Sequence, residues 1–320
     1  MKQIKHILFS LFAIGLLYSL GMFALKTIKY KQRPAIFITN DYYNWKGGDT
    51  YLKYKEFNRS QLHDIVFAGS SRAYRGYSPY IFGNHNYYTF NLGTSAQSIK
   101  NTFFVIKHYI DSTNCKVLLL DVFAGAFTKN QLESSSDLIE NISKPIAAYD
   151  IAWHNKEVRT INLAAFRYLS ENDSAYFKKK DYKGKGYSSR TDSMPKNKQA
   201  QFFSNEKLSH KTIEIDDEQI SYFDKIITMC HTRGVKLVCV YSPVSYFYDY
   251  SQHNNFISLI KKNIEVNDVI FYDFSKLENL SSAYHFYDDS HLNEAGVSIF
   301  NEELIKQLQT DNLIKINATN

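Results

Sequence analysis

The segment DIVFAGSSR, residues 64–72, passes from four apolar residues directly into a small polar turn. An uninterrupted apolar run of this kind is typical of a strand buried on both faces of a parallel sheet. Gly69 can adopt the backbone angles of a sharp turn out of such a strand. Ser71 then lies just beyond the carboxyl end of the strand, where open α/β sheets bind ligands. Taken alone, the same letters also fit a turn of small polar residues without function.

A second segment, FYDDSHLNEAG at residues 286–296, changes this balance. Asp288 and His291 are three residues apart, directly before a helical pattern. A carboxylate so close to a histidine can orient it, and an oriented histidine can deprotonate a serine. A surface loop with a helix cap at Asn293 is the alternative explanation. The two segments together, at opposite ends of an α/β pattern, favour a catalytic site.

These two segments resemble the first and last signature blocks of the SGNH (GDSL-type) hydrolases. In that family the nucleophilic serine is the third residue of a Gly-Asp-Ser block, and here Ser70 occupies the aspartate position. A later Asp-x-x-His block supplies the acid and the base. The resemblance therefore implies Ser71 as nucleophile, His291 as general base and Asp288 as the residue that orients the histidine.

The middle blocks of the family match less completely. Gly93 follows the second expected strand, and the resemblance implies that the backbone N–H groups of Gly93 and Ser71 face the oxyanion. The Gly-x-Asn-Asp block is absent, because the third expected strand ends in LDVFAG, residues 120–125. The family's oxyanion asparagine therefore has no clear counterpart. Ser95 and Gln97 are near enough in sequence to replace it.

The Gly-Ser-Ser-Arg form and an apolar N-terminal segment resemble a divergent branch of the family. That branch includes proteins of teichoic-acid D-alanylation and alginate O-acetylation. The resemblance implies a membrane-anchored serine esterase or O-acyltransferase acting on acyl esters of a cell-envelope or exported glycan. It implies an acylated glycan or small ester as substrate, no metal or organic cofactor, and a multi-pass membrane acyltransferase as protein partner.

A different class of function fits the same residues. A membrane-tethered module that binds glycan, or a scaffold for a membrane acyltransferase, would use Asp288 and His291 structurally. Reactivity separates these functions, because a serine-directed fluorophosphonate labels Ser71 only if the serine is activated.

Strand and helix patterns alternate along the chain, which predicts an α/β fold. Strands are expected at 64–69, 87–92, 116–122, 236–241 and 269–274, and helices at 97–110, 216–233, 252–264 and 293–309. The resemblance implies a three-layer α/β/α sandwich whose five-stranded parallel sheet has flavodoxin-like order. A classical α/β-hydrolase and a Rossmann dehydrogenase are disfavoured, because neither a Gly-x-Ser-x-Gly elbow nor a three-glycine turn occurs.

Composition limits the other possibilities. The 320-residue chain is 44% hydrophobic, which suffices for a sizeable core, and its net charge is +6. No nucleic-acid-binding motif accompanies this charge, so no nucleic-acid partner is expected. Cys115, Cys230 and Cys239 lie in apolar patterns and are expected to be buried thiols. No metal site is expected, since no Cys/His pair has zinc spacing.

Residues 7–25 contain no charged side chain and are long enough for about one bilayer crossing. A cleavable signal peptide usually has a shorter apolar core and a small-residue cleavage site, so we expect an uncleaved single-pass anchor. More positive charge follows this segment than precedes it, which would place the following chain in the cytoplasm. The resemblance implies the opposite, an extracytoplasmic domain at the cell membrane, and we follow the resemblance.

The expected organisation has four parts. These are an N-terminal membrane anchor at 1–33, a connection at 34–63, an SGNH-like α/β domain at 64–310 with an insertion at about 123–215, and a tail at 311–320. Helical patches are expected in the insertion at 131–142 and 146–170. The insertion is either a solvated loop region or a flap over the site, in which Tyr187 or Arg190 would meet an anionic glycan.

The orientation is testable with a reporter. We expect alkaline phosphatase fused after Arg33 to be active, because this reporter folds only outside the cytoplasm. Phosphatase activity in whole cells is the measurement. Activity of a cytoplasmic reporter at the same junction would show instead that the flanking charges set the orientation.

Overall fold

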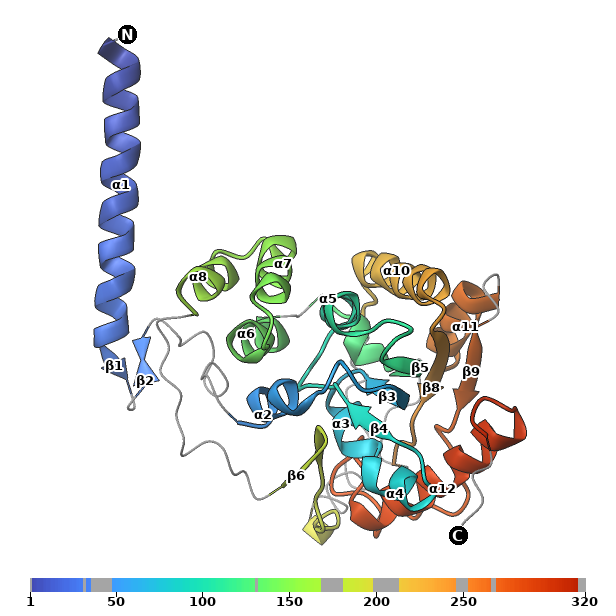
Figure 1. The fold of residues 1–320 in the computed structure, drawn as a ribbon. Helices are drawn as coiled ribbons and strands as arrows, with labels where there is room; N and C mark the ends of the chain where they lie inside the picture. Colours follow the sequence, from blue (N-terminus) through green and yellow to red (C-terminus); the bar gives the residue numbers. More distant parts are fainter. Residues whose placement is uncertain are drawn as a thin grey trace.

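The computed structural model describes residues 2–30, 33–35, 48–129, 132–167, 181–197, 213–245, 253–265 and 269–315. Its centre is a five-stranded parallel sheet with helices on both sides (Figure 1). The expected α/β fold and three-layer arrangement are confirmed.

The order of the strands across the sheet is flavodoxin-like. From one edge to the other they are β4 (Thr89–Asn91), β3 (His63–Ala68), β5 (Cys115–Asp121), β8 (Lys236–Tyr241) and β9 (Ile270–Asp273). All neighbouring pairs are parallel. Every strand overlaps one of the ranges expected from the sequence, to within two residues at its start. The chain order reverses between β3 and β5, and such a switch point opens a crevice at the carboxyl ends of the two strands.

The two faces of the sheet carry separate cores, which explains the uninterrupted apolar runs. Val66 and Leu118 pack in one core, and their sequence neighbours Phe67 and Leu119 pack in the other. The first face is covered by α2 (Gly48–Glu56), α5 (Ile99–Tyr109), α10 (Asp217–Arg233) and α11 (His253–Ile264). The second face is covered by α3 (Ser71–Gly76), α4 (Pro79–Asn84) and α12 (Glu294–Thr310). The four helices expected from helical spacing are confirmed.

The insertion after β5 is folded in most of its described part. A short 3₁₀ helix, η2 (Ala124–Phe127), is followed by α6 (Leu132–Asn141), α7 (Pro145–Asn155) and α8 (Val158–Phe166). The single helical patch expected at 146–170 is therefore two helices. The break falls at Lys156, whose backbone is left-handed with φ of 57°. A hairpin of β6 (Tyr182–Gly184) and β7 (Tyr187–Ser188) follows.

The expected connection at 34–63 needs a correction in its second half. Helix α2 belongs to the folded unit, because Tyr54 and the following Phe57 are buried in the first core. Residues 36–47 lie outside the described residues, as do 316–320 of the expected tail.

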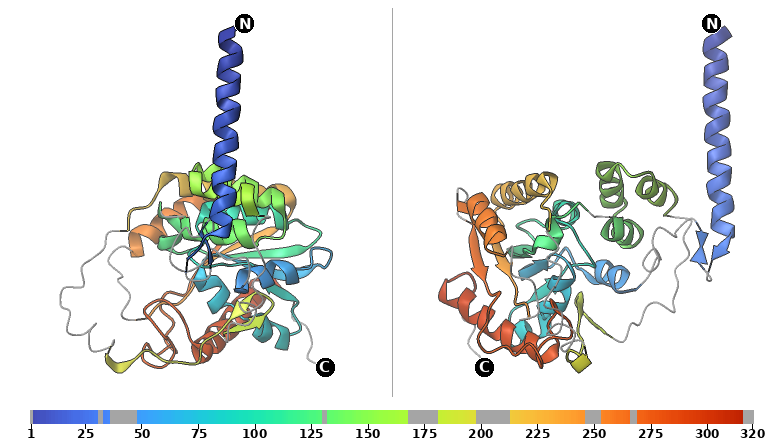
Figure 2. Two further views of the ribbon diagram at one scale, coloured as in Figure 1. Left: turned by 90° about the vertical axis from the view of Figure 1, so that its left-hand side faces the viewer. Right: turned by 180° about the vertical axis from the view of Figure 1, so that it is seen from behind.

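Helix α1 (Lys2–Thr27) precedes the domain, and a two-stranded pair of β1 (Lys29–Tyr30) and β2 (Arg33–Pro34) follows it. The helix extends away from the α/β unit in both views of Figure 2. Most of its large apolar side chains are exposed. Its length and composition make it a candidate membrane span or signal sequence.

Gly186 fixes the hairpin of the insertion on the edge of the sheet. Its φ is +75°, and a Cβ there would lie 1.8 Å from the carbonyl oxygen of Asn91. We expect Gly186→Ala to lower the free energy of unfolding by more than the roughly 1–2 kcal/mol that left-handed strain alone costs. Urea unfolding followed by circular dichroism measures this loss.

Gly234→Ala is the matched control. Gly234 has a similar φ of +67°, but no neighbouring atom lies within 4 Å of the position that a Cβ would take there. Equal losses in the two variants would mean that the hairpin is not held closely against β4.

Candidate active site

The turn after β3 places Ser71 at the start of α3. Gly69 has φ of +138°, and a Cβ there would lie 3.1 Å from Asp121 and 3.2 Å from Ala73. Ser70 is the N-cap residue, and its Oγ accepts a hydrogen bond from the backbone N–H of Arg72 at 3.4 Å. Glycine is required at the turn, and serine is a favoured cap. The segment therefore holds Ser71 at the carboxyl end of the sheet.

The loop before α12 places the histidine opposite this turn. The Oδ1 atom of Asp288 accepts hydrogen bonds from the backbone N–H groups of Ser290 at 3.0 Å and His291 at 2.8 Å. Asn293 caps α12 by accepting from the N–H of Gly296 at 3.0 Å. Hydrogen bonds therefore hold the end of this loop to the first turn of α12 and hold its middle around the carboxylate of Asp288.

Ser71, His291 and Asp288 meet in one hydrogen-bonded row. The Ser71 Oγ and His291 Nε2 atoms are 2.8 Å apart, and His291 Nδ1 is 2.9 Å from both carboxylate oxygens of Asp288. A charged carboxylate accepts from the Nδ1–H, which leaves Nε2 as the acceptor for the serine hydroxyl. This arrangement can deprotonate Ser71 as it attacks an electrophile.

Two neighbouring aspartates in this loop differ in their pKa. Burial opposes ionisation of Asp288, but its hydrogen bond and charge interaction with His291 and the two backbone N–H groups outweigh burial, so the pKa of Asp288 is lowered. Burial and the charge of Asp288 raise the pKa of Asp289. Asp288 is therefore the carboxylate that stays ionised beside the histidine.

A buried charge network lies beneath Ser71. Arg72 Nε is 3.5 Å from Asp121 Oδ1, and the two side chains are 2% and 0% exposed. Arg72 also donates to the backbone carbonyl of Ser242 at 2.5 Å. Asp121 accepts from Tyr77 at 2.9 Å and from Ser242 at 2.5 Å. The network joins α3 to the ends of β5 and β8.

Gly93 lies near the turn, but its N–H has a partner. The side chain of Asn91 accepts a hydrogen bond from the Gly93 N–H at 3.0 Å, and its Nδ2 donates to the carbonyl oxygens of Ala73 at 2.8 Å and Tyr77 at 3.1 Å. In this arrangement the Gly93 N–H is directed at Asn91. Within the described part of the chain, no acceptor is found for the N–H of Ser71, as expected at the first residue of a helix.

The two side chains considered as replacement oxyanion donors are used elsewhere. Gln97 donates to Thr102 at 2.9 Å and accepts from Thr94 at 2.7 Å. Ser95 donates to Glu133 of α6 at 2.9 Å. Both residues were suggested because they are close to Gly93 in sequence. In the structure both side chains are hydrogen-bonded to other side chains.

Of the two residues suggested for a flap, Arg190 is the one whose side chain is half-exposed beside the histidine loop. Tyr187 is buried in the second core. The guanidinium carbon of Arg190 lies 4.8 Å from the ring centroid of Tyr287, and this ring stacks on the His291 ring with centroids 5.4 Å apart.

Sequence reasoning missed several residues around the row. Lys53 of α2 is buried, and its ammonium group donates to the Gly93 carbonyl. Arg75 lies over the ring of Tyr287 at 5.6 Å. The sequence signals for these contacts were the spacing of four between Ser71 and Arg75 and the position of Tyr287 directly before Asp288. Nothing in the sequence indicated Lys53, because α2 itself was not expected.

All three cysteines are buried free thiols, as expected. Burial raises the pKa of Cys230 to about 12, so this thiol stays protonated. Within the described ranges, no group of three or more His, Cys, Asp or Glu side chains is arranged to hold a metal ion.

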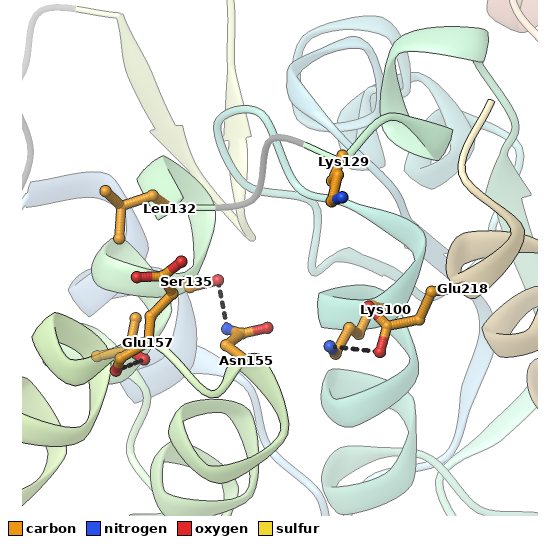
Figure 3. Close-up of a pocket in the computed structure, with 8 residues that line it drawn as sticks. Lys100, Lys129, Leu132, Ser135, Asn155, Glu157 and Glu218 are labelled. Atoms are coloured by element: carbon orange, nitrogen blue, oxygen red, sulfur yellow. Dashed lines mark hydrogen bonds and ion pairs between the residues drawn. The ribbon is translucent and has the colours of Figure 1, made fainter. Parts of the chain in front are cut away.

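A separate cavity of about 240 Å³ lies among α5, α6, the α7–α8 junction and α10 (Figure 3). Its lining includes Lys100, which pairs with Glu218 at 2.9 Å, and Asn155, which donates to Ser135 at 2.6 Å. None of Ser71, Asp288 and His291 lines it. The cavity is therefore distinct from the candidate active site.

Comparison with known proteins gives structural matches only. No protein-family model matches the chain, and no curated protein matches it. Similar solved structures include an acetyl xylan esterase (13% identity, 76% of this chain and 98% of that chain, TM-score 0.42). A GDSL-like lipase from Bacteroides thetaiotaomicron is 10% identical, with 82% of this chain and 99% of that chain covered and a TM-score of 0.40. The acetylxylan esterase Axe2 from Geobacillus stearothermophilus is 9% identical, with 82% of this chain and 100% of that chain covered and a TM-score of 0.42.

The buried Lys53 predicts a pH effect on stability. Burial lowers its pKa from 10.5 to about 8, against the opposing charges of Asp49 and Asp137. Between about pH 8 and 10.5 the unfolded chain keeps a proton that the folded chain has lost, so this group makes the free energy of unfolding rise with pH. The slope of wild type should exceed that of Lys53→Met by up to about 1.4 kcal/mol per pH unit. Urea unfolding between pH 7.5 and 10.5 measures both slopes.

Lys116→Met is the control, because Lys116 is exposed and its ammonium group pairs with Asp64 at the surface. Its slope should equal that of wild type. Parallel profiles for wild type and Lys53→Met would show that Lys53 is solvated.

Proposed function

We propose that the protein is a serine esterase or O-acyltransferase that works through Ser71, His291 and Asp288. The observation that carries the proposal is the row of hydrogen bonds from Ser71 Oγ to His291 Nε2 at 2.8 Å and from His291 Nδ1 to Asp288 at 2.9 Å. The position of Ser71 at the switch point of the sheet supports it further, because open α/β sheets bind their ligands there.

The first half-reaction forms an acyl-enzyme. Ser71 Oγ attacks the ester carbonyl carbon while His291 Nε2 takes the hydroxyl proton, and Asp288 stabilises the imidazolium that results. Collapse of the tetrahedral intermediate breaks the carbon–oxygen bond of the ester. His291 then protonates the leaving alcohol, which leaves the acyl group on Ser71.

The second half-reaction decides between hydrolysis and transfer. Water or an acceptor hydroxyl attacks the acyl-Ser71 carbonyl while His291 takes its proton. Collapse of the intermediate breaks the bond to Ser71 Oγ, which receives that proton from His291, and releases the carboxylic acid or the acylated acceptor. The N–H of Ser71 supports an oxyanion site, whereas a second donor requires the Gly93 N–H to leave Asn91 or to be shared with it. One oxyanion donor is worth about 2.7–4 kcal/mol of barrier, so this exchange sets much of the rate.

Helix α1 supports a membrane setting for the reaction. As a candidate membrane span, it would hold the domain close to the cell membrane. We propose acyl esters of a cell-envelope or exported glycan as substrates and a multi-pass membrane acyltransferase as the protein partner. The alternative, a scaffold or glycan-binding module without turnover, needs no activated serine.

Labelling and turnover test the proposal together. Full-length protein in detergent should react with a fluorophosphonate and hydrolyse 4-nitrophenyl acetate. Ser71→Ala should lose both, and His291→Ala should lose about 10⁴-fold or more in kcat/KM. The double variant should be little worse than either single variant, because the two residues act as one unit.

Ser70→Ala is the matched control, since it removes the neighbouring serine but keeps the nucleophile. It should label normally and lose about 1 kcal/mol of stability with the helix cap. Wild type that labels no more than Ser71→Ala would refute the enzyme and favour the binding module.

A further inference from the structure

Two arginines flank the tyrosine that stacks on His291. The rings of Tyr287 and His291 are nearly parallel, with an angle of 10° and centroids 5.4 Å apart. The guanidinium carbon of Arg190 lies 4.8 Å from the centroid of Tyr287, and that of Arg75 lies 5.6 Å from it. Positive charge is therefore placed one ring away from the proposed general base.

Arg75 and Ser71 share one face of α3. They are four residues apart in the helix, so their side chains lie one above the other. Helical side chains lean toward the N-terminus, which directs the long Arg75 side chain toward the turn that carries Ser71. A substrate bound at Ser71 would extend past Arg75 along this face.

Arg75 has no carboxylate partner among the described residues. Its Nε donates to the hydroxyl of Tyr74 at 3.2 Å, and its Nη1 is buried without any hydrogen-bond partner. Asp181 acts on its charge only at longer range. Arg72, one position after Ser71 on the same helix, is buried against Asp121 at 3.5 Å. A buried N–H donor is usually hydrogen-bonded, and for the Nη1 of Arg75 no acceptor is found among the described residues.

Two other cations lie near Arg75, and each has a carboxylate near it. Lys53 and Arg75 both lie over the ring of Tyr74, at 4.8 and 5.1 Å from its centroid, but Lys53 is buried and the charges of Asp49 and Asp137 offset its own. Arg190 is half-exposed and pairs with Asp192 at 2.5 Å, so solvent and this partner screen part of the charge that it adds. Arg75 remains the cation with a buried, unused donor.

We propose that Arg75, together with Arg190, binds an anionic group of the acyl-ester substrate, a carboxylate or a phosphate next to the scissile ester. This subsite rests on the proposed function, because it takes Ser71 as the point of attack. A guanidinium group binds either anion through two parallel N–H···O bonds. The substrate class is therefore an ester on an anionic molecule, such as an acidic or phosphorylated glycan.

Binding without turnover tests the subsite separately from catalysis. In full-length Ser71→Ala protein, inorganic phosphate and acetate are titrated in separate experiments at constant ionic strength, with chloride as the balancing ion. Calorimetry should detect binding of phosphate if the natural substrate carries a phosphate group, and binding of acetate if it carries a carboxylate. Adding Arg75→Gln should weaken that binding at least tenfold. Arg75→Lys keeps the positive charge but loses the two parallel N–H donors of the guanidinium group, so its affinity for the anion should be intermediate.

Arg159→Gln in the same background is the control, because Arg159 is exposed on α8. It should bind as the background does. Circular dichroism establishes that each variant is folded, and Arg75→Lys carries the test if Arg75→Gln does not fold. Undiminished binding in the Arg75 variants, or no binding of either anion, would overturn the subsite.

Selectivity supplies the second readout. In protein that keeps Ser71, kcat/KM is measured for hydrolysis of the acetyl group of 4-acetoxybenzoate and of its methyl ester. The two substrates share one aromatic framework and differ in the negative charge of the carboxylate. The ratio of the two kcat/KM values therefore measures the preference for that charge. Arg75→Gln should lower this ratio about tenfold or more. An unchanged ratio overturns the subsite. Anion binding that depends on Arg75 in a protein whose Ser71 is never labelled overturns the proposed function and leaves an anion-binding site.

Discussion

The buried pair of Arg72 and Asp121 is the interaction on which the geometry of the site depends. It joins the first turn of α3 to the end of β5, and Ser242 extends the link to the end of β8. Replacing a buried pair by apolar residues is often neutral, so its main effect here is to fix position rather than to add stability. Removing one partner is different, since an uncompensated buried charge costs about 3–5 kcal/mol. Ser71 directly precedes Arg72, and its position is therefore set by three strands and a helix.

The loop of His291 is fixed from the other side by the insertion. The N–H of Glu294 donates to the carbonyl of Arg190 at 2.7 Å, and that of Met194 donates to the carbonyl of Phe286 at 2.8 Å. These backbone bonds bracket the loop that carries Asp288 and His291. Electrostatics then separates the two aspartates of the loop, because a lowered pKa keeps Asp288 charged while burial and its neighbour raise that of Asp289. The sequence motif alone gives no such distinction between adjacent aspartates.

Much of the fold follows from the sequence because its signals are local. Strands buried on both faces produce long apolar runs, and residues 116–122 and 236–241 were located on that basis alone. Ser71, Asp288 and His291 were located because the turn and the Asp-x-x-His spacing are short motifs. Helix α2 was missed because its sequence, GDTYLKYKE, is polar and buries a lysine. Asn91 and Arg75 were missed because the groups that they contact, the carbonyls of α3 and the ring of Tyr287, lie on other elements. Ser95 and Gln97 failed as oxyanion donors for the same reason, since tertiary contacts decide where a polar side chain points.

The insertion contacts both the turn after β4 and the loop that carries His291. The segment 181–197 contributes Gly186, which packs against the carbonyl of Asn91, and Asn91 in turn holds the N–H of Gly93. The same segment contributes Arg190, whose backbone holds α12 and whose side chain lies over Tyr287. An anion bound at Arg75 and Arg190, as proposed, would contact the segment that packs against both the histidine loop and the strand end before Gly93. Because the Gly93 N–H already has a partner, an oxyanion must compete with Asn91 for it. In the proposed mechanism, a two-donor oxyanion site therefore depends on Asn91 releasing or sharing this N–H, and not on the position of Ser71 alone.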